Sequence, residues 1–206
     1  MEHRDFLAVI VVALIIVTIG MTFGSDMIQS VGQQRTTTAT ATVIYYTGFT
    51  ITESVISGGN LTILDVCYSP GGNCAAVIQK YWDAATKSIY VAIYSFTLNN
   101  LADSLVKAKV RGVIVQAVFD KTQMAVQGSQ YLYLKQSGVE VKIDRAVDML
   151  HDKFSIIDGT IVITGSFNLS SHANLDNREN LLVIDSVDVA KTYYDQFVII
   201  WNESGD

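Results

Sequence analysis

The sequence is poor in basic residues. Among its 206 residues, 14 lysines and arginines are outnumbered by 20 aspartates and glutamates, which gives a formal net charge of −6 and a pI of about 4.9. Affinity for the nucleic-acid backbone normally comes from a basic face, so this balance excludes a protein that coats nucleic acid over a broad surface. The sequence also lacks an internal repeat, which excludes a solenoid or a propeller.

Metal-binding patterns are missing as well. Neither a His-x-x-x-His spacing nor a paired-cysteine spacing occurs, although Asp120, Asp144 and Asp148 lie near the ends of expected strands. Histidine and cysteine ligands at such spacings mark most zinc sites. A metal-dependent nuclease is therefore poorly supported, and we expect no metal and no other cofactor.

The chain has two cysteines and a single proline. Cys67 and Cys74 bracket a turn-rich loop, Tyr-Ser-Pro-Gly-Gly-Asn, which is short enough to be closed by a disulfide. Such a bond would suit an oxidising compartment. Two buried free thiols are the alternative.

One long hydrophobic run stands near the N-terminus. Residues 6–23 contain no charged side chain over 18 positions, about the minimum for a helix that crosses a bilayer. A cleaved signal peptide is the alternative, but no Ala-x-Ala site follows until residues 39–41. We therefore predict an uncleaved transmembrane anchor, preceded by a short flank of residues 1–5. Arg4 before the run and Arg35 after it weakly favour an extracytoplasmic domain.

The remainder divides into a tether and one domain. Residues 24–42 are rich in Thr, Ser and Gln and predict a polar tether, whereas residues 43–206 alternate between strand-like and helix-like patterns. This order predicts an α/β layered sandwich, with a mixed, largely parallel sheet flanked by helices. The expected strands are 59–68, 88–95, 113–119, 139–143 and 180–184, and the expected helices are 73–86, 99–110, 127–137 and 187–201.

A β-hairpin is expected between the fourth of these strands and the fifth. Asp158 and Gly159 form a two-residue turn signal between the β-rich runs 154–157 and 160–164. A two-residue turn sets Ile157 opposite Thr160 and, further out, Phe154 opposite Ile163 and Lys153 opposite Thr164.

Continuing this register brings polar side chains together. His151 then lies opposite Ser166, and directly opposed residues share a face of the hairpin. Lys153 and Asn168 follow by alternation, so His151, Lys153, Ser166 and Asn168 emerge on one face at one end. Asp158 lies at the other end, roughly 20 Å away at about 3.3 Å per residue, and we expect it to serve the turn.

The spacing of these residues resembles a known signature. His-x-Lys-x4-Asp-x6-Gly-Ser-x-Asn, the motif of the phospholipase D superfamily, is met at every position from His151 to Asn168. The resemblance extends from about Asp65 to Trp201 and is greatest to the single-motif endonucleases of the superfamily. It implies a phospholipase D/nuclease-like fold and a metal-independent phosphodiesterase that works through a phosphohistidine.

The resemblance also implies roles for the residues. His151 would be the nucleophile, and Lys153 and Asn168 would hold the non-bridging phosphate oxygens. Glu179, 28 residues after His151, would accept a proton from the other imidazole nitrogen and so orient the ring. Ser166 would tune the same pocket, or would be an ordinary hydroxyl bonded to the backbone.

Other basic residues are candidates for substrate binding. Lys121 and Arg145 follow expected strands, and Arg178 precedes Glu179. Together with Lys153 they would form a narrow positive cleft for a single strand or a frayed duplex. The alternative for these cations is that they are scattered solvated charges. The alternative for Glu179 is an ion pair with Arg178 or with Lys153 of a neighbour.

The number of histidines in the motif bears on the oligomeric state. A double displacement needs one histidine to attack and another to protonate the leaving group, yet the motif occurs once. His3 precedes the hydrophobic run, and His172 has no lysine at the motif spacing, so we expect it in an exposed loop. The second motif is therefore expected from a second copy of the chain, in a twofold homodimer.

Three functions are compatible with these features. The first is a membrane-tethered nuclease that acts on DNA or RNA. The second is a phospholipase D or cardiolipin hydrolase that acts on membrane lipid, since the tether would hold the domain beside phospholipid headgroups. The third is a non-catalytic dimer that binds nucleic acid.

Overall fold

The computed structural model describes residues 60–146 and 148–205. The expected anchor at residues 6–23, the tether at 24–42 and the first part of the expected domain, 43–59, lie outside the described residues. In the part of the chain that is described, no helix combines the length and the apolar character needed to span a bilayer.

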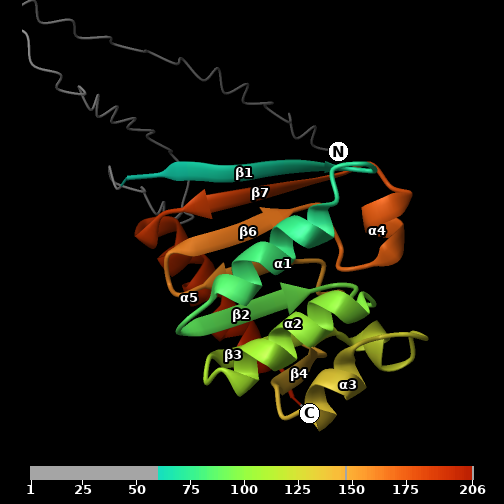
Figure 1. The fold of residues 1–206 in the computed structure, drawn as a ribbon. Helices are drawn as coiled ribbons and strands as arrows, with labels where there is room; N and C mark the ends of the chain where they lie inside the picture. The colour runs from blue at the N-terminus through green and yellow to red at the C-terminus, as the bar shows by residue number, and fades with distance from the viewer. Residues whose placement is uncertain (1–59, 147, 206) are drawn as a thin grey trace, which may run out of the picture. The chain divides into compact units, whose positions relative to one another are not determined.

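A single mixed sheet of seven strands forms the centre of the described domain, in the order β1-β7-β6-β5-β2-β3-β4 (Figure 1). Its strands are β1 (Thr62–Ser69), β2 (Ser88–Ile93), β3 (Ile114–Asp120), β4 (Glu140–Asp144), β5 (Lys153–Ile157), β6 (Ile161–Gly165) and β7 (Glu179–Asp185). The central strands β2, β5 and β6 are apolar and largely buried, as expected of strands covered on both faces.

Helices cover both faces of the sheet. The helices α1, α2 and α3 share one hydrophobic core with the sheet, and α5 shares a second core with its other face. Trp82 of α1 is fully buried in the first core and Phe197 of α5 in the second. The helical elements are α1 (Cys74–Ala84), α2 (Asn99–Val110), the 3-10 helix η1 (Lys121–Met124), α3 (Tyr131–Gln136), α4 (Ser171–Leu175) and α5 (Val187–Glu203).

The expectation of a largely parallel sheet is wrong. Only β2, β3 and β4 pair in parallel, whereas the pairs β1–β7, β7–β6, β6–β5 and β5–β2 are antiparallel. A parallel pair needs a crossover, which α2 and α3 provide between β2, β3 and β4. The connections β4–β5 and β5–β6 contain no helix, so the chain turns back on itself there. Furthermore, α1 leads from β1 to a strand that is not its neighbour.

The hairpin turn forms where the sequence predicts it, but its register differs by one residue. Asp158 and Gly159 both have positive φ angles of 53° and 73°, and the Thr160 N–H donates to the Ile157 carbonyl at 3.1 Å. The ladder nevertheless pairs Ile157 with Ile161 and not with Thr160. Thr160 thus remains outside the ladder, between the turn and the first pair of the hairpin.

The same shift applies along the whole hairpin. Phe154 lies opposite Thr164, whereas a two-residue turn predicts Ile163 at that position. The expected pairing of Lys153 with Thr164 and of His151 with Ser166 is therefore wrong. Because side chains alternate along a strand, hairpin pairing alone does not bring His151 and Ser166 to one face.

Asp158 serves the turn, as expected, and it also joins two distant segments. Its carboxylate accepts hydrogen bonds from the backbone N–H groups of Thr86, Lys87 and Ser88, at 3.0, 2.7 and 3.0 Å, and from the Thr86 hydroxyl. Burial tends to raise the pKa of Asp158, but these hydrogen bonds outweigh it and leave the pKa below its ordinary value. Asp158 therefore fixes the hairpin to the loop that precedes β2.

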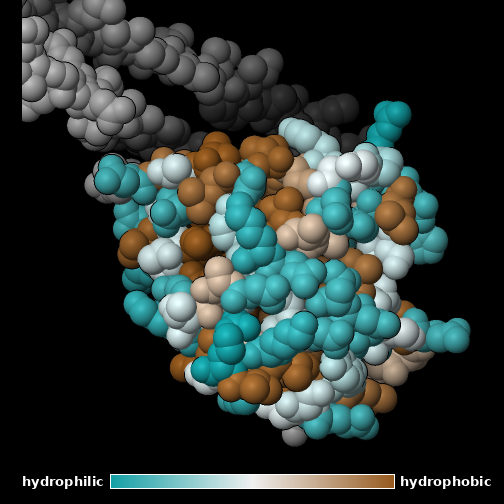
Figure 2. Space-filling model, viewed as in Figure 1, coloured by the Kyte–Doolittle hydropathy of each residue, from teal (hydrophilic) through white to brown (hydrophobic). Residues whose placement is uncertain are grey.

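A disulfide and an apolar strand mark the outer edge of the sheet. Cys67 in β1 is bonded to Cys74 at the start of α1, with their Cα atoms 5.6 Å apart, so the alternative of two free thiols does not hold. Large apolar side chains along β1 are exposed among the described residues, and Figure 2 shows apolar surface gathered in this region. They are Leu61, Ile63, Leu64, Val66 and Tyr68.

Candidate active site

The ends of three neighbouring strands bring the motif residues together. β5 begins at Lys153, β6 ends at Gly165 and β7 begins at Glu179, and because these strands are antiparallel neighbours, all three points lie at one edge of the sheet. One pocket at this edge, the motif pocket, contains every residue that was expected to be catalytic. It is lined by His151, Lys153, Gly165, Ser166, Asn168 and Glu179.

Gly165 explains how the pocket forms despite the shifted register. A Cβ atom at this position would lie 2.2 Å from the Asn180 carbonyl oxygen, and the backbone has a φ angle of 151°. Only glycine allows this close approach of β6 to β7. The chain leaves the ladder here, and the Ser166 N–H donates to the Asn180 carbonyl at 3.1 Å. The departure from β6, rather than hairpin parity, places Ser166 beside Glu179.

The Ser166 hydroxyl is a bridge between the two strand ends. It donates to Glu179 Oε2 at 2.5 Å and accepts from the Asn180 N–H at 3.1 Å. Ser166 was expected either to act in the pocket or to bond to the backbone. Its hydroxyl does both, since it bonds to the Asn180 backbone and also to Glu179 in the pocket. Its position fixes one oxygen of the Glu179 carboxylate.

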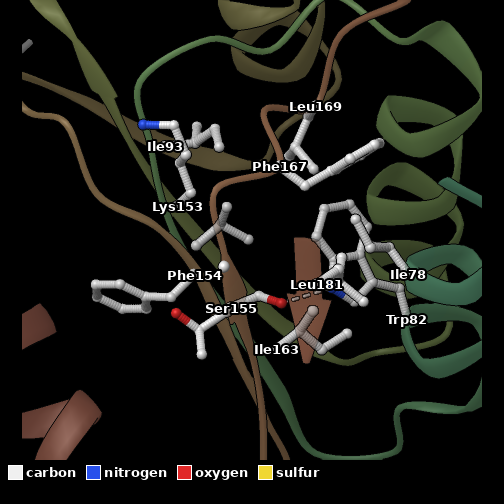
Figure 3. A pocket seen from close by; sticks show the side chains of 13 residues that line it. Ile78, Trp82, Ile93, Lys153, Phe154, Ser155, Ile163, Phe167, Leu169 and Leu181 are labelled. Carbon is white, nitrogen blue, oxygen red and sulfur yellow. Dashed lines mark hydrogen bonds between the residues drawn. The ribbon is translucent and has the colours of Figure 1, made fainter. Parts of the chain in front are cut away.

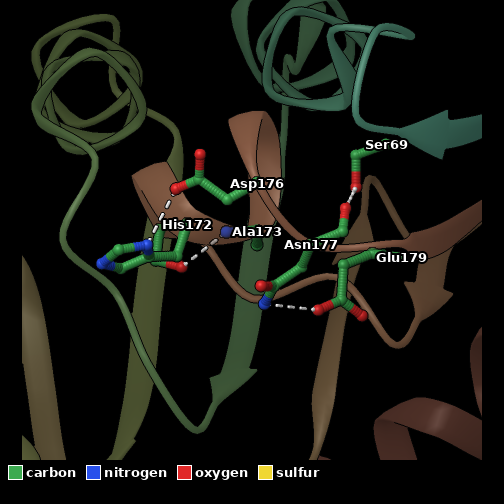
Figure 4. A network of polar contacts seen from close by, with 7 residues as sticks. Ser69, His172, Ala173, Asp176, Asn177 and Glu179 are labelled. Carbon is green, nitrogen blue, oxygen red and sulfur yellow. Dashed lines mark hydrogen bonds and ion pairs between the residues drawn. The ribbon is translucent and has the colours of Figure 1, made fainter.

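The second oxygen of Glu179 is also occupied. Glu179 Oε1 accepts from the Asn177 side-chain amide at 3.1 Å, and the Asn177 carbonyl accepts from the Ser69 hydroxyl at 3.0 Å (Figure 4). Among the described residues, Glu179 forms neither a hydrogen bond with His151 nor an ion pair with Arg178. The orienting contact between Glu179 and His151 therefore stays a prediction, whereas the surrounding network was not anticipated.

His151 and Lys153 both lie against Tyr94, the residue after β2. The His151 and Tyr94 rings are 5.0 Å apart and tilted by 56°, and the Lys153 ammonium lies 5.4 Å from the centre of the Tyr94 ring. Lys153 Nζ donates to the His151 carbonyl at 2.8 Å, and the Tyr94 N–H donates to the Asp152 carbonyl at 3.0 Å. Tyr94 thus supports both motif residues, a role that nothing in its local sequence indicates.

Lys153 is a cation that is partly buried next to apolar side chains. It lies at the border of an apolar pocket lined by Trp82, Ile93 and Phe167, among others (Figure 3). Burial lowers the pKa of Lys153 below the ordinary 10.5, although the charges of Asp152 and Glu179 act in the opposite direction. A phosphate in the pocket would supply the counter-charge that these surroundings provide only in part.

Asn168 presents an unsatisfied group. Its side-chain oxygen is buried and has no hydrogen-bond partner among the described residues. A buried polar group without a partner is costly, so a functional role is the natural explanation. Rotation of the carboxamide by 180° would present the Nδ2 donors instead, from which a phosphate oxygen in the motif pocket would accept.

The expected substrate-binding cations differ in their distance from the pocket. Arg178 is exposed and precedes β7, and it lines a shallow depression that also includes Glu179. Lys121 begins η1 after β3, and Arg145 follows β4, so both lie at the same edge of the sheet. At about 4.8 Å per strand, they are roughly 10 and 14 Å from β5 along this edge.

The acidic residues near the strand ends have structural partners. Asp120 is buried and accepts from the Leu150 N–H at 2.8 Å, which fixes the approach to His151. Asp144 accepts from the Ala146 N–H at 2.8 Å, whereas Asp148 is exposed. Within residues 60–146 and 148–205, no group of three His, Cys, Asp or Glu side chains is placed to hold a metal.

His172 lies outside the motif pocket. It belongs to the short helix α4 and not to a loop as expected, but its side chain is 85 % exposed, in agreement with the prediction. Its Nδ1 lies 2.8 Å from Asp176 (Figure 4). His172 therefore does not supply a second histidine within the same chain's pocket.

The domain is a mixed sheet between two helical layers, and it carries His-x-Lys at the start of one strand and Gly-Ser-x-Asn at the end of the neighbouring strand. This combination defines a phospholipase D-like domain. Residues 78–201 match the family described as "Cardiolipin synthase, PLD-like domain". The chain belongs to the phospholipase D superfamily.

Several known proteins are similar to it. The mitochondrial cardiolipin hydrolase of Xenopus tropicalis is 36 % identical over 119 residues, 58 % of this chain and 57 % of that protein. A phospholipase D of Rickettsia bellii is 33 % identical over 130 residues, 63 % of this chain and 65 % of that protein. The chain thus spans about three fifths of the length of these curated relatives.

Solved structures extend the likeness to the fold. Nuc, a phospholipase D family member from Salmonella typhimurium, superposes with a TM-score of 0.68 at 33 % identity, covering 71 % of this chain and 98 % of that chain. NucT from Helicobacter pylori superposes with a TM-score of 0.61 at 23 % identity, covering 72 % and 98 %. The second likeness concerns the fold alone.

Proposed function

We propose that this chain is a membrane-tethered, metal-independent phosphodiesterase that cleaves nucleic acid. The observation that carries the proposal is the convergence of His151, Lys153, Ser166, Asn168 and Glu179 in one pocket. A nucleophile, a cation, an amide and a carboxylate at one point match the needs of phosphodiester hydrolysis.

The proposed reaction is a double displacement at phosphorus. An imidazole nitrogen of His151 attacks, a phosphorus–nitrogen bond forms, and the bond from phosphorus to the leaving oxygen breaks. The leaving oxygen takes a proton from a second imidazolium. Water then attacks the phosphohistidine and returns a proton to that second imidazole, which frees His151.

The remaining pocket residues stabilise charge. Lys153 and the Asn168 amide hold the non-bridging oxygens, where negative charge accumulates. Glu179, fixed by Ser166 and Asn177, would accept a hydrogen bond from the other imidazole nitrogen of His151 and so orient the ring.

The second imidazole comes from a second copy of the chain. The motif occurs once, and His172 is exposed and paired with Asp176 outside the motif pocket. A twofold homodimer that joins two motif pockets face to face would supply His151 from each copy.

Two substrate classes compete for this site. Nucleic acid is supported by the basic side chains of Lys121, Arg145 and Arg178, which follow or precede strands at the same edge of the sheet as the motif pocket, although the chain as a whole is acidic. Phospholipid is the second candidate, supported by the relatives named cardiolipin hydrolase and phospholipase D and by the expected anchor at residues 6–23.

An extracytoplasmic position of the domain is part of the proposal. The disulfide between Cys67 and Cys74 supports it, because such bonds persist mainly in oxidising compartments. A domain on that side would be digested by protease added outside intact cells or spheroplasts. Digestion only after membrane lysis would contradict the orientation.

The test compares the full chain in detergent with two histidine variants. Single-stranded DNA, RNA, duplex DNA and cardiolipin vesicles are offered with and without chelator. We expect nucleic-acid cleavage that survives chelation and falls by at least about 10³-fold in His151→Ala. His172→Ala, the matched control at an exposed histidine, should keep full activity.

Each alternative has its own signature in this test. Cleavage of lipid alone would refute the nuclease proposal and support the second candidate. Loss of activity on chelation would refute metal independence. Equal activity of His151→Ala and the unmodified chain would refute the assignment of the nucleophile.

A further inference from the structure

A second pocket adjoins the motif pocket on the α5 side of the sheet. It shares His151, Lys153 and Gly165 with the motif pocket, so a molecule whose phosphate lies against His151 would have its next group beside this second pocket. We call it the helix-side pocket. Its other lining residues are Asp152, Phe154, Thr164, Thr192, Tyr193 and Gln196.

The walls of the helix-side pocket are held in place by packing. The Tyr193 ring meets the Phe154 ring edge-on, at 5.1 Å and 76°, and the Tyr193 hydroxyl donates to the Thr164 hydroxyl at 3.3 Å. Figure 3 shows Phe154 directed away from the apolar pocket beside Lys153. The aromatic wall is thus packed into the core that α5 shares with the sheet.

The polar lining is available to a ligand. The Gln196 carboxamide is exposed and forms no hydrogen bond with any described residue, which leaves both its donors and its acceptor unused. The Asp152 carboxylate is half-buried and accepts no hydrogen bond from the described residues. Thr192 donates to the Asp188 carbonyl at 3.0 Å and keeps its oxygen free to accept.

This lining distinguishes between kinds of substrate. An acyl chain needs a continuous apolar slot, whereas this pocket has a carboxylate, a carboxamide and a hydroxyl beside one aromatic wall. A second phosphate would be repelled by Asp152. A nucleobase has an aromatic face for Tyr193, N–H groups for Asp152 and both donors and acceptors for Gln196.

We propose that the helix-side pocket binds the nucleobase of the nucleotide next to the scissile phosphate, with Gln196 as a specificity-determining residue. This inference rests on the proposed phosphodiesterase function and narrows its substrate class. The pocket makes the enzyme prefer a nucleoside-bearing diester to a simple one, because only the former occupies both pockets.

Three chromogenic diesters test the proposal with the full chain in detergent. They are methyl 4-nitrophenyl phosphate, thymidine 5′-(4-nitrophenyl phosphate) and thymidine 3′-(4-nitrophenyl phosphate). We expect Gln196→Ala to lower kcat/KM about 3- to 10-fold for at least one thymidine diester and to leave the simple diester unchanged, as the loss of one hydrogen bond predicts. Asn202→Ala, which removes another exposed carboxamide of α5 outside this pocket, is the matched control.

The outcomes separate this inference from the proposed function. Turnover of all three diesters with no effect of Gln196→Ala, or with an equal effect on all three, would overturn the nucleobase pocket and leave the phosphodiesterase intact. A Gln196→Ala effect on cardiolipin vesicles alone would overturn it in favour of a lipid headgroup. If no diester is hydrolysed, the proposed function fails.

Binding provides a readout that needs no turnover. By isothermal titration, thymidine 5′-monophosphate should bind the full chain more tightly than inorganic phosphate does, and Gln196→Ala should reduce this preference about 3- to 10-fold. Equal affinity for the two probes in the unmodified chain would overturn the nucleobase pocket whether or not the protein is active.

Discussion

At the scale of single residues, Lys153 is a cation whose partly buried surroundings stabilise its charge poorly. Its ammonium is partly buried beside Tyr94, at the border of an apolar pocket, and it donates only to the His151 carbonyl among the described residues. These surroundings disfavour the charge that the proposed chemistry requires. The nearby charges of Asp152 and Glu179 offset the cost only in part.

This arrangement predicts the alkaline limb of the pH–rate profile. Burial lowers the pKa of Lys153, so the ammonium proposed to hold the phosphate loses its proton at a pH below the ordinary 10.5, and kcat/KM should fall as the pH rises through that lowered pKa. Glu179→Gln removes a charge that raises this pKa, so the limb should move to lower pH. The measurement is kcat/KM against pH with a thymidine diester.

An arginine at position 153 provides the control. A guanidinium stays charged throughout the accessible range, so Lys153→Arg should lose the alkaline limb even if its maximal rate is lower. An unchanged limb in Lys153→Arg would assign the titration to another group.

At the scale of elements, the hairpin β5–β6 carries the motif at one end and is fixed at the other. Asp158 joins its turn to the loop before β2 through hydrogen bonds to Thr86, Lys87 and Ser88. The motif aspartate is therefore a structural residue, remote from the chemistry. Its contribution should appear in stability and not in turnover.

We expect Asp158→Ala to lower the free energy of unfolding by about 2 kcal/mol, because several hydrogen bonds to one carboxylate are lost. The pKa of Asp158 is lowered in the folded state, so its stabilisation is present above the ordinary value of 3.8 and disappears as the pH falls through the lowered pKa. Denaturant unfolding of the full chain in detergent, at neutral and at acidic pH, measures both effects.

The matched control is Asp195→Ala. Asp195 forms an exposed ion pair with Lys191, and such pairs contribute about 0–1 kcal/mol. An Asp158→Ala variant no less stable than Asp195→Ala, or one whose folded fraction is inactive, would contradict the structural role.

The elements also show what the sequence predicts and what it cannot. Local patterns correctly place most of the strands and helices, because periodicity and turn residues act over short distances. They do not predict which strand pairs with β1, nor that β5 and β7 are antiparallel to their neighbours. The alternation of strands and helices along the chain does not determine which strands pair. They also miss α4 and the single residue, Thr160, that shifts the hairpin register.

The active site, too, is predicted from the sequence only in part. The motif spacing predicts the residues of the pocket, but not the bonds from Ser166 and Asn177 to Glu179, which depend on the meeting of β6 and β7. The contacts of Tyr94 and Gln196 do not follow from the motif spacing, because these residues reach the site only through the packing of β2 and α5.

At the scale of the whole molecule, one chain of the proposed enzyme holds half of an active site. The described part of the chain offers one motif pocket with one histidine, and the double displacement needs two. A second copy would bring its own His151 to the same phosphate, so each copy would be inactive without an intact partner.

Co-expression of the unmodified chain with His151→Ala in equal amounts tests whether the active site is shared between two chains. Random pairing makes about one quarter of the dimers fully intact, so a shared site should give about one quarter of the activity of the same amount of unmodified protein. Light scattering on the same sample should give the mass of a dimer. Activity close to one half, in proportion to the intact chains, would show that each chain works alone and would rule out a shared site.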